Sequence, residues 1–340
     1  MVTHPLATHT GVGLMVAAAS TAPSVHNTQP WRFRRRDRDA MELHVDMNRL
    51  LYVIDPRGRA MHISCGAALF NLCLAIRASG HQPWVRRLPD SDDQPTLLAD
   101  VHIERAAPPT QAEAELYSVL PRRRTNRGPF DDRAVPRRVL AELAAAANYE
   151  GATLRLLDPV AAAHAVSLVA AADDELTASE DYRAELADWT FTRTSDTDAS
   201  SEARPDGVPW YTFGPRPSRR GLPIRDFGLA HHVAGRAVND FTAMPHLAAL
   251  ITEGNEPEDW LVAGQALQRV LLTATLHGVS ASFLTQPLDL RDVRENRDIA
   301  GVRHRPGPLD HVQMIIRFGY GRPAPGAPRR PIAQILDRTA

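Results

Sequence analysis

The chain has 340 residues, of which 44% are hydrophobic and 23% are charged, so it can bury one large core or two ordinary ones. A formal net charge of −1 excludes the global basic field that is typical of nucleic-acid-binding proteins. The sequence contains no lysine, and this excludes both a catalytic lysine and a Walker A phosphate loop.

The first expected elements are a helix, a polar loop and a surface hairpin. An Ala-rich apolar segment at residues 12–20 predicts the helix, and the loop 22–30 ends it because its two prolines lack an N–H and fix φ. Alternating residues at 31–33 and 41–45 predict the hairpin. The apolar segment is too short to span a membrane and no basic residue precedes it, so we expect neither a membrane anchor nor a signal peptide.

Two long helices, expected at 63–78 and 259–276, are apolar nearly all round and therefore belong in a core or an interface. Glycines bracket the two helices at positions that are 198 residues apart: Gly66 and Gly80, then Gly264 and Gly278. We expect a strand after each helix. This pattern predicts an internal duplication.

The remaining elements mix helices and strands. Helices are expected at 111–120, 136–147 and 160–176, and strands at 97–103, 153–157, 246–252 and 312–318. A Pro-containing linker at 106–109 separates a first half, residues 1–108, from a second half, residues 109–340.

The second half contains an irregular stretch at about 194–227. Trp210, Tyr211 and Phe213 lie there among Ser, Asp, Pro, Gly and Arg residues. A loop of this length is typically either disordered or functional, so we interpret the stretch as a lid-like insert.

The loop 22–30 carries several side chains that can bind a ligand, beside backbone amides that its irregular course leaves free. The order Ala-Pro-Ser, then Asn, then Gln-Pro-Trp resembles the loop of nitroreductase-family flavoproteins that wraps one edge of FMN. The version His-Asn-Thr-Gln-Pro-Trp-Arg is similar to the Acg-like subfamily known from mycobacteria. The resemblance implies that the cofactor-binding residues here are Pro23, Ser24, His26, Asn27, Gln29 and Trp31.

A basic segment opens the second half. The guanidinium groups of Arg123, Arg124 and Arg127 and the Thr125 hydroxyl suit a phosphate, although a solvated basic turn has the same composition. The segment resembles the Arg-Arg-Ser-x-Arg-x-Phe phosphate motif of nitroreductases, with one extra residue before the Phe. Arg329 and Arg330 near the C-terminus are similar to the second basic element of that site. The resemblance implies that Arg127 faces the flavin pyrimidine edge.

A third match is Thr285-Gln286-Pro287, which resembles the family segment whose backbone approaches flavin N5, although Thr and Gln are also ordinary at a strand end. His26 suits a proton donor, but a loop histidine bonded to backbone is the more common case. The fourteen histidines show no metal-ligand spacing, and Gly11-Val12-Gly13 lacks the context of a dinucleotide-binding motif.

In nitroreductases the FMN lies across a dimer interface, with the loop from one subunit and the phosphate motif from the other. Here the first half has only the loop and the second half only the motif. The resemblance therefore implies a fused pseudo-dimer, either monomeric or a weak homo-oligomer, with one FMN per chain.

The resemblance implies an α+β nitroreductase-like fold present twice, and FMN-dependent oxidoreduction. NAD(P)H would pass a hydride to FMN, and a nitroaromatic or quinone-type acceptor would then take the electrons. The alternative is a flavin-sequestering protein whose insert closes over the ring through Trp210, Tyr211 or Phe213.

Cys65 and Cys73 share one expected helix and would lie about 12 Å apart at about 1.5 Å per residue, too far for a disulfide. Two unpaired thiols suit a reducing compartment, so we expect a cytoplasmic protein with no membrane or nucleic-acid partner.

Overall fold

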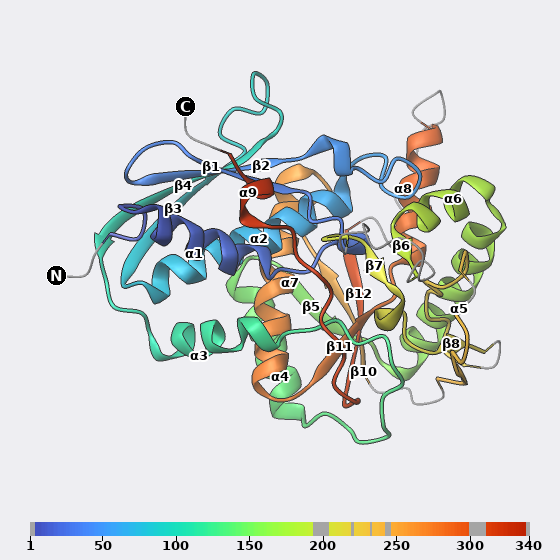
Figure 1. Cartoon of the computed structure of the whole chain (residues 1–340). Helices are drawn as coiled ribbons and strands as arrows, with labels where there is room; N and C mark the ends of the chain where they lie inside the picture. Colours follow the sequence, from blue (N-terminus) through green and yellow to red (C-terminus); the bar gives the residue numbers. More distant parts are fainter. Residues whose placement is uncertain are drawn as a thin grey trace.

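The computed structural model describes residues 4–192, 204–218, 221–231, 233–241, 246–298 and 311–337. The helices are α1 (His9–Ser20), α2 (Arg59–Ala78), α3 (Gln111–Val119), α4 (Arg137–Tyr149), α5 (Pro159–Ala178), α6 (Glu180–Asp188), α7 (Pro257–Leu276), α8 (Gln286–Asp298) and α9 (Ile332–Ile335) (Figure 1). The strands are β1 (Trp31–Arg35), β2 (Ala40–Val45), β3 (His81–Arg87), β4 (Leu97–Ala106), β5 (Thr153–Leu156), β6 (Thr190–Phe191), β7 (Val208–Pro209), β8 (Arg216–Pro217), β9 (Val238–Asn239), β10 (His246–Ile251), β11 (Ser280–Phe283), β12 (Val312–Gly319) and β13 (Leu336–Asp337). The fold is α+β, as predicted.

Two sheets of matching topology form the framework. The first has the strand order β13-β1-β2-β4-β3 and the second has the order β11-β12-β10-β5. All neighbours are antiparallel except β13, which pairs parallel with β1. The chain order α1-β1-β2-α2-β3-β4 thus corresponds, element by element and in spatial order, to α4-β5-β10-α7-β11-β12.

Helices α2 and α7 cross at the centre of the molecule, between the two sheets (Figure 1). Gly66 and Gly264 allow this crossing because their backbones touch: a Cβ on Gly66 would lie 2.2 Å from the Leu261 carbonyl oxygen, and one on Gly264 would lie 2.1 Å from that of Ile63. A larger residue at either glycine would force the helices apart.

The contacts beside the crossing are reciprocal. Gln268 donates to Asn71 at 2.8 Å, and the Arg269 guanidinium lies 5.3 Å from the centroid of the Phe70 ring. At the 198-residue offset Asn71 corresponds to Arg269 and Phe70 to Gln268, so the two contacts join equivalent positions of the two helices. Both helices also end alike, because Gly80 and Gly278 adopt left-handed φ values of 83° and 65° just beyond the last turn.

The hydrophobic core has two main parts that share residues across the crossing. One part is built on α1, α2 and the first sheet, and it includes Leu261 and Leu272 of α7. The other is built on α4, α7 and the second sheet, and it includes Ile63 of α2. Among the described helices, α2 alone has the length and hydropathy of a membrane span, and 83% of that window is buried inside the protein.

Three features differ from the sequence predictions. Helix α2 begins at Arg59, four residues early, because the Asp55 carboxylate accepts hydrogen bonds from the Ala60 and Met61 amides at 2.9 and 2.8 Å. Helix α8 was not expected. The C-terminal β13 returns to the first sheet, although it lies far beyond residue 108.

The segment between α6 and β10, residues 189–245, is called the insert below. It includes the predicted lid-like stretch at 194–227, of which 194–203 and 219–220 lie outside the described residues. Its described part forms two short strand pairs, β6 with β7 and β8 with β9.

Candidate functional site

The loop between α1 and β1 forms one wall of the site. His26, Asn27 and Gln29 have φ values of 43°, 55° and 50°, a region that residues other than glycine adopt at a cost. The Ser24 hydroxyl accepts a hydrogen bond from the Gln29 backbone amide at 2.9 Å. The Val25 backbone amide donates to the Ser64 hydroxyl of α2 at 3.1 Å. These contacts hold the strained loop against the central helix.

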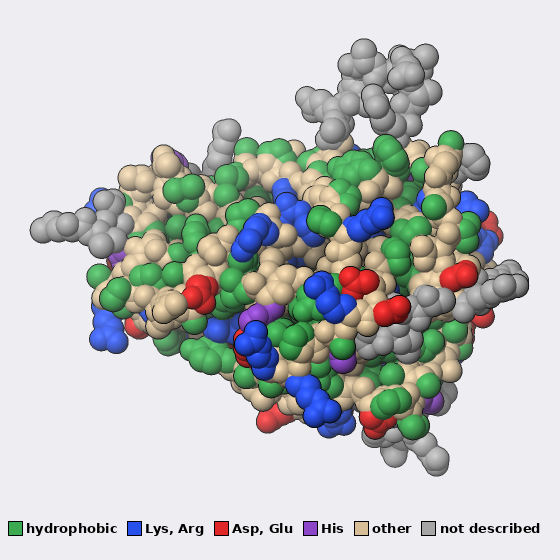
Figure 2. Space-filling view, turned by 90° about the horizontal axis from the view of Figure 1, so that it is seen from below, with side chains coloured by type: hydrophobic (Ala, Val, Ile, Leu, Met, Phe, Trp, Pro, Cys, Tyr) green, Lys and Arg blue, Asp and Glu red, His purple; other side chains and the backbone are tan. Residues whose placement is uncertain are grey.

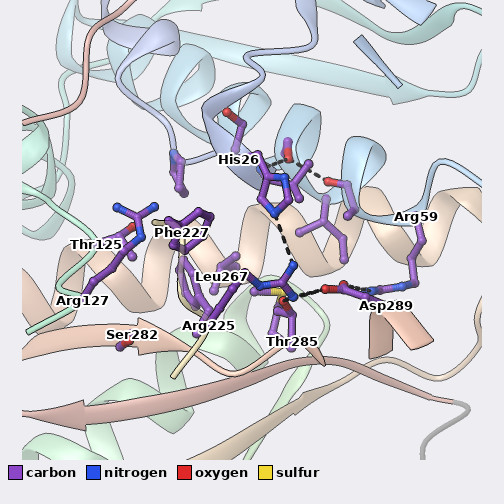
Figure 3. A pocket seen from close by; sticks show the side chains of 18 of the residues that line it. His26, Arg59, Thr125, Arg127, Arg225, Phe227, Leu267, Ser282, Thr285 and Asp289 are labelled. Atoms are coloured by element: carbon purple, nitrogen blue, oxygen red, sulfur yellow. Dashed lines mark hydrogen bonds and ion pairs between the residues drawn. The ribbon is translucent and has the colours of Figure 1, made fainter. Parts of the chain in front are cut away.

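A cavity of ≈ 870 Å³, counted out to its open mouth, lies between this loop, α2, the insert and residues 120–130, which we call the arm (Figure 3). We call it the larger compartment, because its volume exceeds the ≈ 400 Å³ of the basic compartment beside it. Its lining comprises Pro23, Ser24, Val25, His26, Arg59, Ala60, Ile63, Ser64, Thr125, Arg127, Ile224, Arg225, Phe227, Leu267, Ser282, Phe283, Thr285, Asp289 and Met314. Both halves and the insert therefore contribute to one cavity.

A basic compartment continues from the larger one. The two share Pro23, Ser24, Thr125 and Arg127, and the basic compartment adds Asn27, Arg123, Arg124, Thr212, Pro325, Ala327 and Arg329. Four arginines thus meet here from the arm and from residues 320–331, which we call the C-terminal strap. Within the described chain, their guanidinium groups have backbone carbonyl and amide oxygens as partners and no carboxylate.

Arg123 is the most deeply buried of the four, with 3% of its surface exposed. It donates to the Thr21 carbonyl at 3.3 Å, but its Nε and Nη1 have no partner among the described residues. Burial, together with the charges of Arg329, Arg124 and Arg127, lowers its pKa to about 9. An anion with several acceptor oxygens would satisfy these donors and offset the repulsion.

Arg225 of the insert spans the floor of the larger compartment, and its charge is balanced. It forms an ion pair with Asp289 of α8 and donates to the Thr285 hydroxyl at 3.3 Å (Figure 3). It also donates to the Tyr182 hydroxyl at 3.2 Å. Burial opposes its charge, but Tyr182 and Asp289 raise its pKa. Arg59 extends this network, because it lies 4.0 Å from Asp289 and pairs with Asp292 at 2.6 Å.

His26 projects from the loop toward Arg225 (Figure 3). Its Nε2 lies 3.3 Å from Arg225 Nη1, which can only donate, so Nε2 must accept. Burial and the charges of Arg225 and Arg127 lower the pKa of His26 well below its ordinary value. The neutral ring therefore carries its proton on Nδ1, which has no partner among the described residues.

Phe227 is the aromatic residue that the insert places in the larger compartment. The Arg127 guanidinium lies 4.6 Å from the centroid of its ring, and His26 meets the ring edge-on at 5.5 Å. The prediction for Trp210, Tyr211 and Phe213 was therefore wrong about which aromatic covers the cavity. Phe213 is buried in the same hydrophobic cluster as Phe227 but does not line the cavity, and the other two are 41% and 47% exposed.

The structure brings most of the predicted site residues to the two compartments: Pro23, Ser24, His26, Asn27, Arg123, Arg124, Thr125, Arg127, Thr285 and Arg329. The others, Gln29, Trp31, Gln286, Pro287 and Arg330, line neither.

Those five residues belong to the surrounding framework. Gln29 accepts from the Arg330 amide at 2.8 Å and so joins the loop to the C-terminal strap. Trp31 is fully buried in the first core. Gln286 donates to Asp173 at 3.2 Å, and Pro287 is buried in the first turn of α8.

Sequence reasoning missed Arg225, Phe227, Asp289 and Arg59. Asp289 was recognisable in principle, because it follows Thr285 by four residues and would share its face on a helix. Arg225 and Phe227 carried no such signal, because they lie in the insert, where no periodicity orients them.

Comparisons with known proteins agree with this architecture. Residues 120–320 match the model of the nitroreductase family. The Mycobacterium tuberculosis (strain H37Rv) protein named "Putative NAD(P)H nitroreductase Rv3131" is 31% identical over 338 residues, which cover 96% of this chain and 91% of that protein. "Putative NAD(P)H nitroreductase acg" of the same strain is 31% identical over 335 residues, covering 94% and 93%.

Among solved structures, the FMN-dependent nitroreductase NfnB from Mycobacterium smegmatis in complex with NADPH covers 67% of this chain and 99% of its own, with 17% identity and a TM-score of 0.37. The family model and the two mycobacterial relatives show that the chain belongs to the nitroreductase family.

Proposed function

We propose that the chain is an FMN-dependent oxidoreductase that takes a hydride from NAD(P)H and passes electrons to a nitroaromatic or quinone-type acceptor. The observation that carries the proposal is the group of four arginines without a carboxylate partner in the described chain, next to a cavity that is lined in part by apolar side chains. Arg123 Nε and Nη1 are buried donors without an acceptor there, and a phosphate supplies such acceptors. The residues present therefore fit the phosphate and ring of FMN.

In this proposal Arg123, Arg124 and Arg329 hold the phosphate, helped by the Thr125 hydroxyl. When bound, FMN supplies a ring that accepts a hydride and returns electrons. Arg127 lines both compartments, so it would place a positive charge beside the ring and stabilise negative charge that develops there. The Arg225–Asp289 pair keeps its position because each charge already has its partner.

We infer one FMN per chain, from a duplicated fold. The matched topology and the reciprocal contacts at Gly66 and Gly264 support a duplication in which residues 1–108 and 109–340 are the two halves. Only the first half supplies the loop with His26 and Asn27, and only the second supplies the arm. One complete set of binding residues follows.

We further propose a monomeric pseudo-dimer or weak homo-oligomer that works in the cytoplasm on small molecules. On the face shown in Figure 2, acidic and basic side chains are interspersed with apolar ones. Together with the formal net charge of −1, this face supports the expectation that no nucleic acid is bound.

A second candidate function is flavin sequestration, and the position of Phe227 favours it. If Phe227 and Arg225 of the insert exclude the nicotinamide from the ring, FMN would be held without turnover.

Anaerobic mixing with NADPH tests the proposed function. We expect bleaching of the bound flavin and reoxidation by a quinone. Flavin that stays oxidised in the parent chain but bleaches in Phe227→Ser would support sequestration. Failure of the chain to bind FMN at all would contradict both candidates.

A further inference from the structure

A third compartment adjoins the two already described. It offers ≈ 1070 Å³, counted out to its open mouth, between the arm, the turn 211–214 of the insert and the strap 321–325. It shares Thr125 and Arg127 with the other two compartments, and also Thr212 and Pro325 with the basic one. The site therefore continues from the larger compartment, past the arginines, into this groove.

The walls of the groove are fixed by backbone contacts. Asn126 donates to the Arg322 carbonyl at 2.9 Å, which ties the strap to the arm. Gly214 has a left-handed φ of 75°, and a Cβ there would lie 2.5 Å from the Arg127 carbonyl oxygen. Glycine at this position thus lets the insert approach the arm closely.

The groove combines a flat ring with two arginines, Arg127 and Arg322, and one carboxylate, Asp131. Tyr211 is 47% exposed, and Trp210 supports its ring edge-on at a centroid distance of 6.0 Å. Pro323 and Pro325 line the groove as well. The Arg322 guanidinium is exposed and has no hydrogen-bond or ion-pair partner within the described residues.

These features suit a heteroaromatic base joined to phosphate, because a base can stack on an aromatic face and guanidinium groups bind phosphate oxygens. We propose that the groove binds the adenosine part of a dinucleotide, with the base against Tyr211 and the phosphates toward Arg127 and Arg322. The inference rests on the proposed function and extends it. The adenosine belongs either to FAD, bound through the same basic compartment as FMN, or to the donor NAD(P)H.

Tyr211→Ala is the principal test, and Tyr211→Phe retains the ring. Loss of one base–aromatic stack corresponds to about fivefold or more in affinity. We expect Tyr211→Ala to weaken FAD binding, or NADPH binding to the FMN-loaded chain, by at least that factor while FMN affinity changes less than about twofold. Tyr52→Ala is the matched control, because Tyr52 is 70% exposed and lies outside all three compartments.

Arg322→Gln should lower the affinity for the same ligand. The control Arg105→Gln, which removes an exposed arginine of β4, should leave that affinity unchanged. If only the affinity for FAD falls, the groove binds the adenosine of the flavin. If only the affinity for NADPH falls, the groove binds the adenosine of the hydride donor.

Unchanged affinity for both ligands in Tyr211→Ala would overturn the inference, as would a parent chain that binds neither. Failure of FMN binding would instead contradict the proposed function, and the FAD and NADPH titrations of the parent and Tyr211→Ala would still decide the groove.

Discussion

The two halves of the chain share a framework but divide the chemistry between them. Each has a helix, two strands, a long buried helix and two further strands in the same spatial order. In the described chain, however, the strained loop belongs to the first half, and the arm and insert to the second. The difference teaches that the same framework occurs twice around the helix crossing. The cavity, in contrast, is formed once, from a loop of one half and the arm and insert of the other.

The charges around the cavity follow the same division. At the floor, Arg225 and Arg59 each have an aspartate partner. In the basic compartment, Arg123 and Arg329 have no carboxylate partner among the described residues. A carboxylate partner offsets the desolvation cost of a buried cation, whereas a buried cation without a partner costs stability until a ligand arrives.

Loss of a balanced charge should have the largest effect. Asp289→Asn leaves Arg225 buried with a neutral partner, and breaking a buried ion pair costs about 3–5 kcal/mol. Urea unfolding should show a decrease of that size, whereas Asp92→Asn at an exposed turn should change little. Equal stability of Asp289→Asn and the parent would mean that the pair is not part of the framework.

The shared framework is tested by Gly66→Ala and Gly264→Ala. Each added methyl meets a backbone carbonyl of the opposite helix, and overpacking costs about 1–3 kcal/mol, here toward the upper end. The two variants should lose similar amounts of unfolding free energy. Gly13→Ala is the control, because a Cβ there meets nothing within 4 Å and alanine favours the helix. A large loss of unfolding free energy in only one of the two variants would show that the two glycines are not equivalent.

Removal of an unbalanced charge should impair binding rather than folding. Arg123→Gln should lower the affinity for FMN by a factor of about 10 to 100, because a charge-assisted hydrogen bond contributes about 1.5–3 kcal/mol. Riboflavin, which lacks the phosphate, should bind nearly as before, and the ligand-free variant should be no less stable than the parent. Arg122→Gln, an exposed neighbour outside the basic compartment, is the matched control. Equal losses for FMN and riboflavin would place Arg123 away from the phosphate.

The smallest expected effect concerns His26 and pH. In the folded chain the pKa of His26 lies well below 6.5. Near pH 6.5 the unfolded chain therefore binds a proton at His26, whereas the folded chain leaves the ring neutral. The contribution of His26 to stability is therefore complete above pH 6.5 and is lost below it, by at most about 1.4 kcal/mol per pH unit. Unfolding of parent and His26→Gln between pH 7.5 and 5 measures this, and His26→Gln should show the shallower slope. Identical slopes would show that His26 protonates freely in the folded state.

The sequence predicted the framework well because glycines and apolar periodicity are local signals. The match of Gly66 with Gly264 and the alternation in the strands required no tertiary information. Helix α8 was missed because its sequence is rich in Asp and Arg and has few apolar residues. Its first turn is held by long-range contacts, such as Gln286 with Asp173.

The lining of the two compartments was predictable where its residues are contiguous in the sequence, as in the loop and the arm. It was not predictable where charge pairing crosses the chain: Arg225 and Asp289 are 64 residues apart, and no local pattern joins them. The same limit explains the wrong aromatic in the insert. Trp210 and Tyr211 are larger than Phe227, but the course of the backbone decides which ring enters the cavity.

Flavin stoichiometry tests the central claim most directly, namely that two matched halves form one site. The purified chain should be reconstituted with excess FMN, freed of unbound ligand, and assayed for flavin absorbance against protein concentration. We expect one FMN per 37.4 kDa chain, and the same value for Arg122→Gln. Two FMN per chain would contradict the division of the site between the halves, and none would contradict the assignment of the unbalanced arginines to its phosphate.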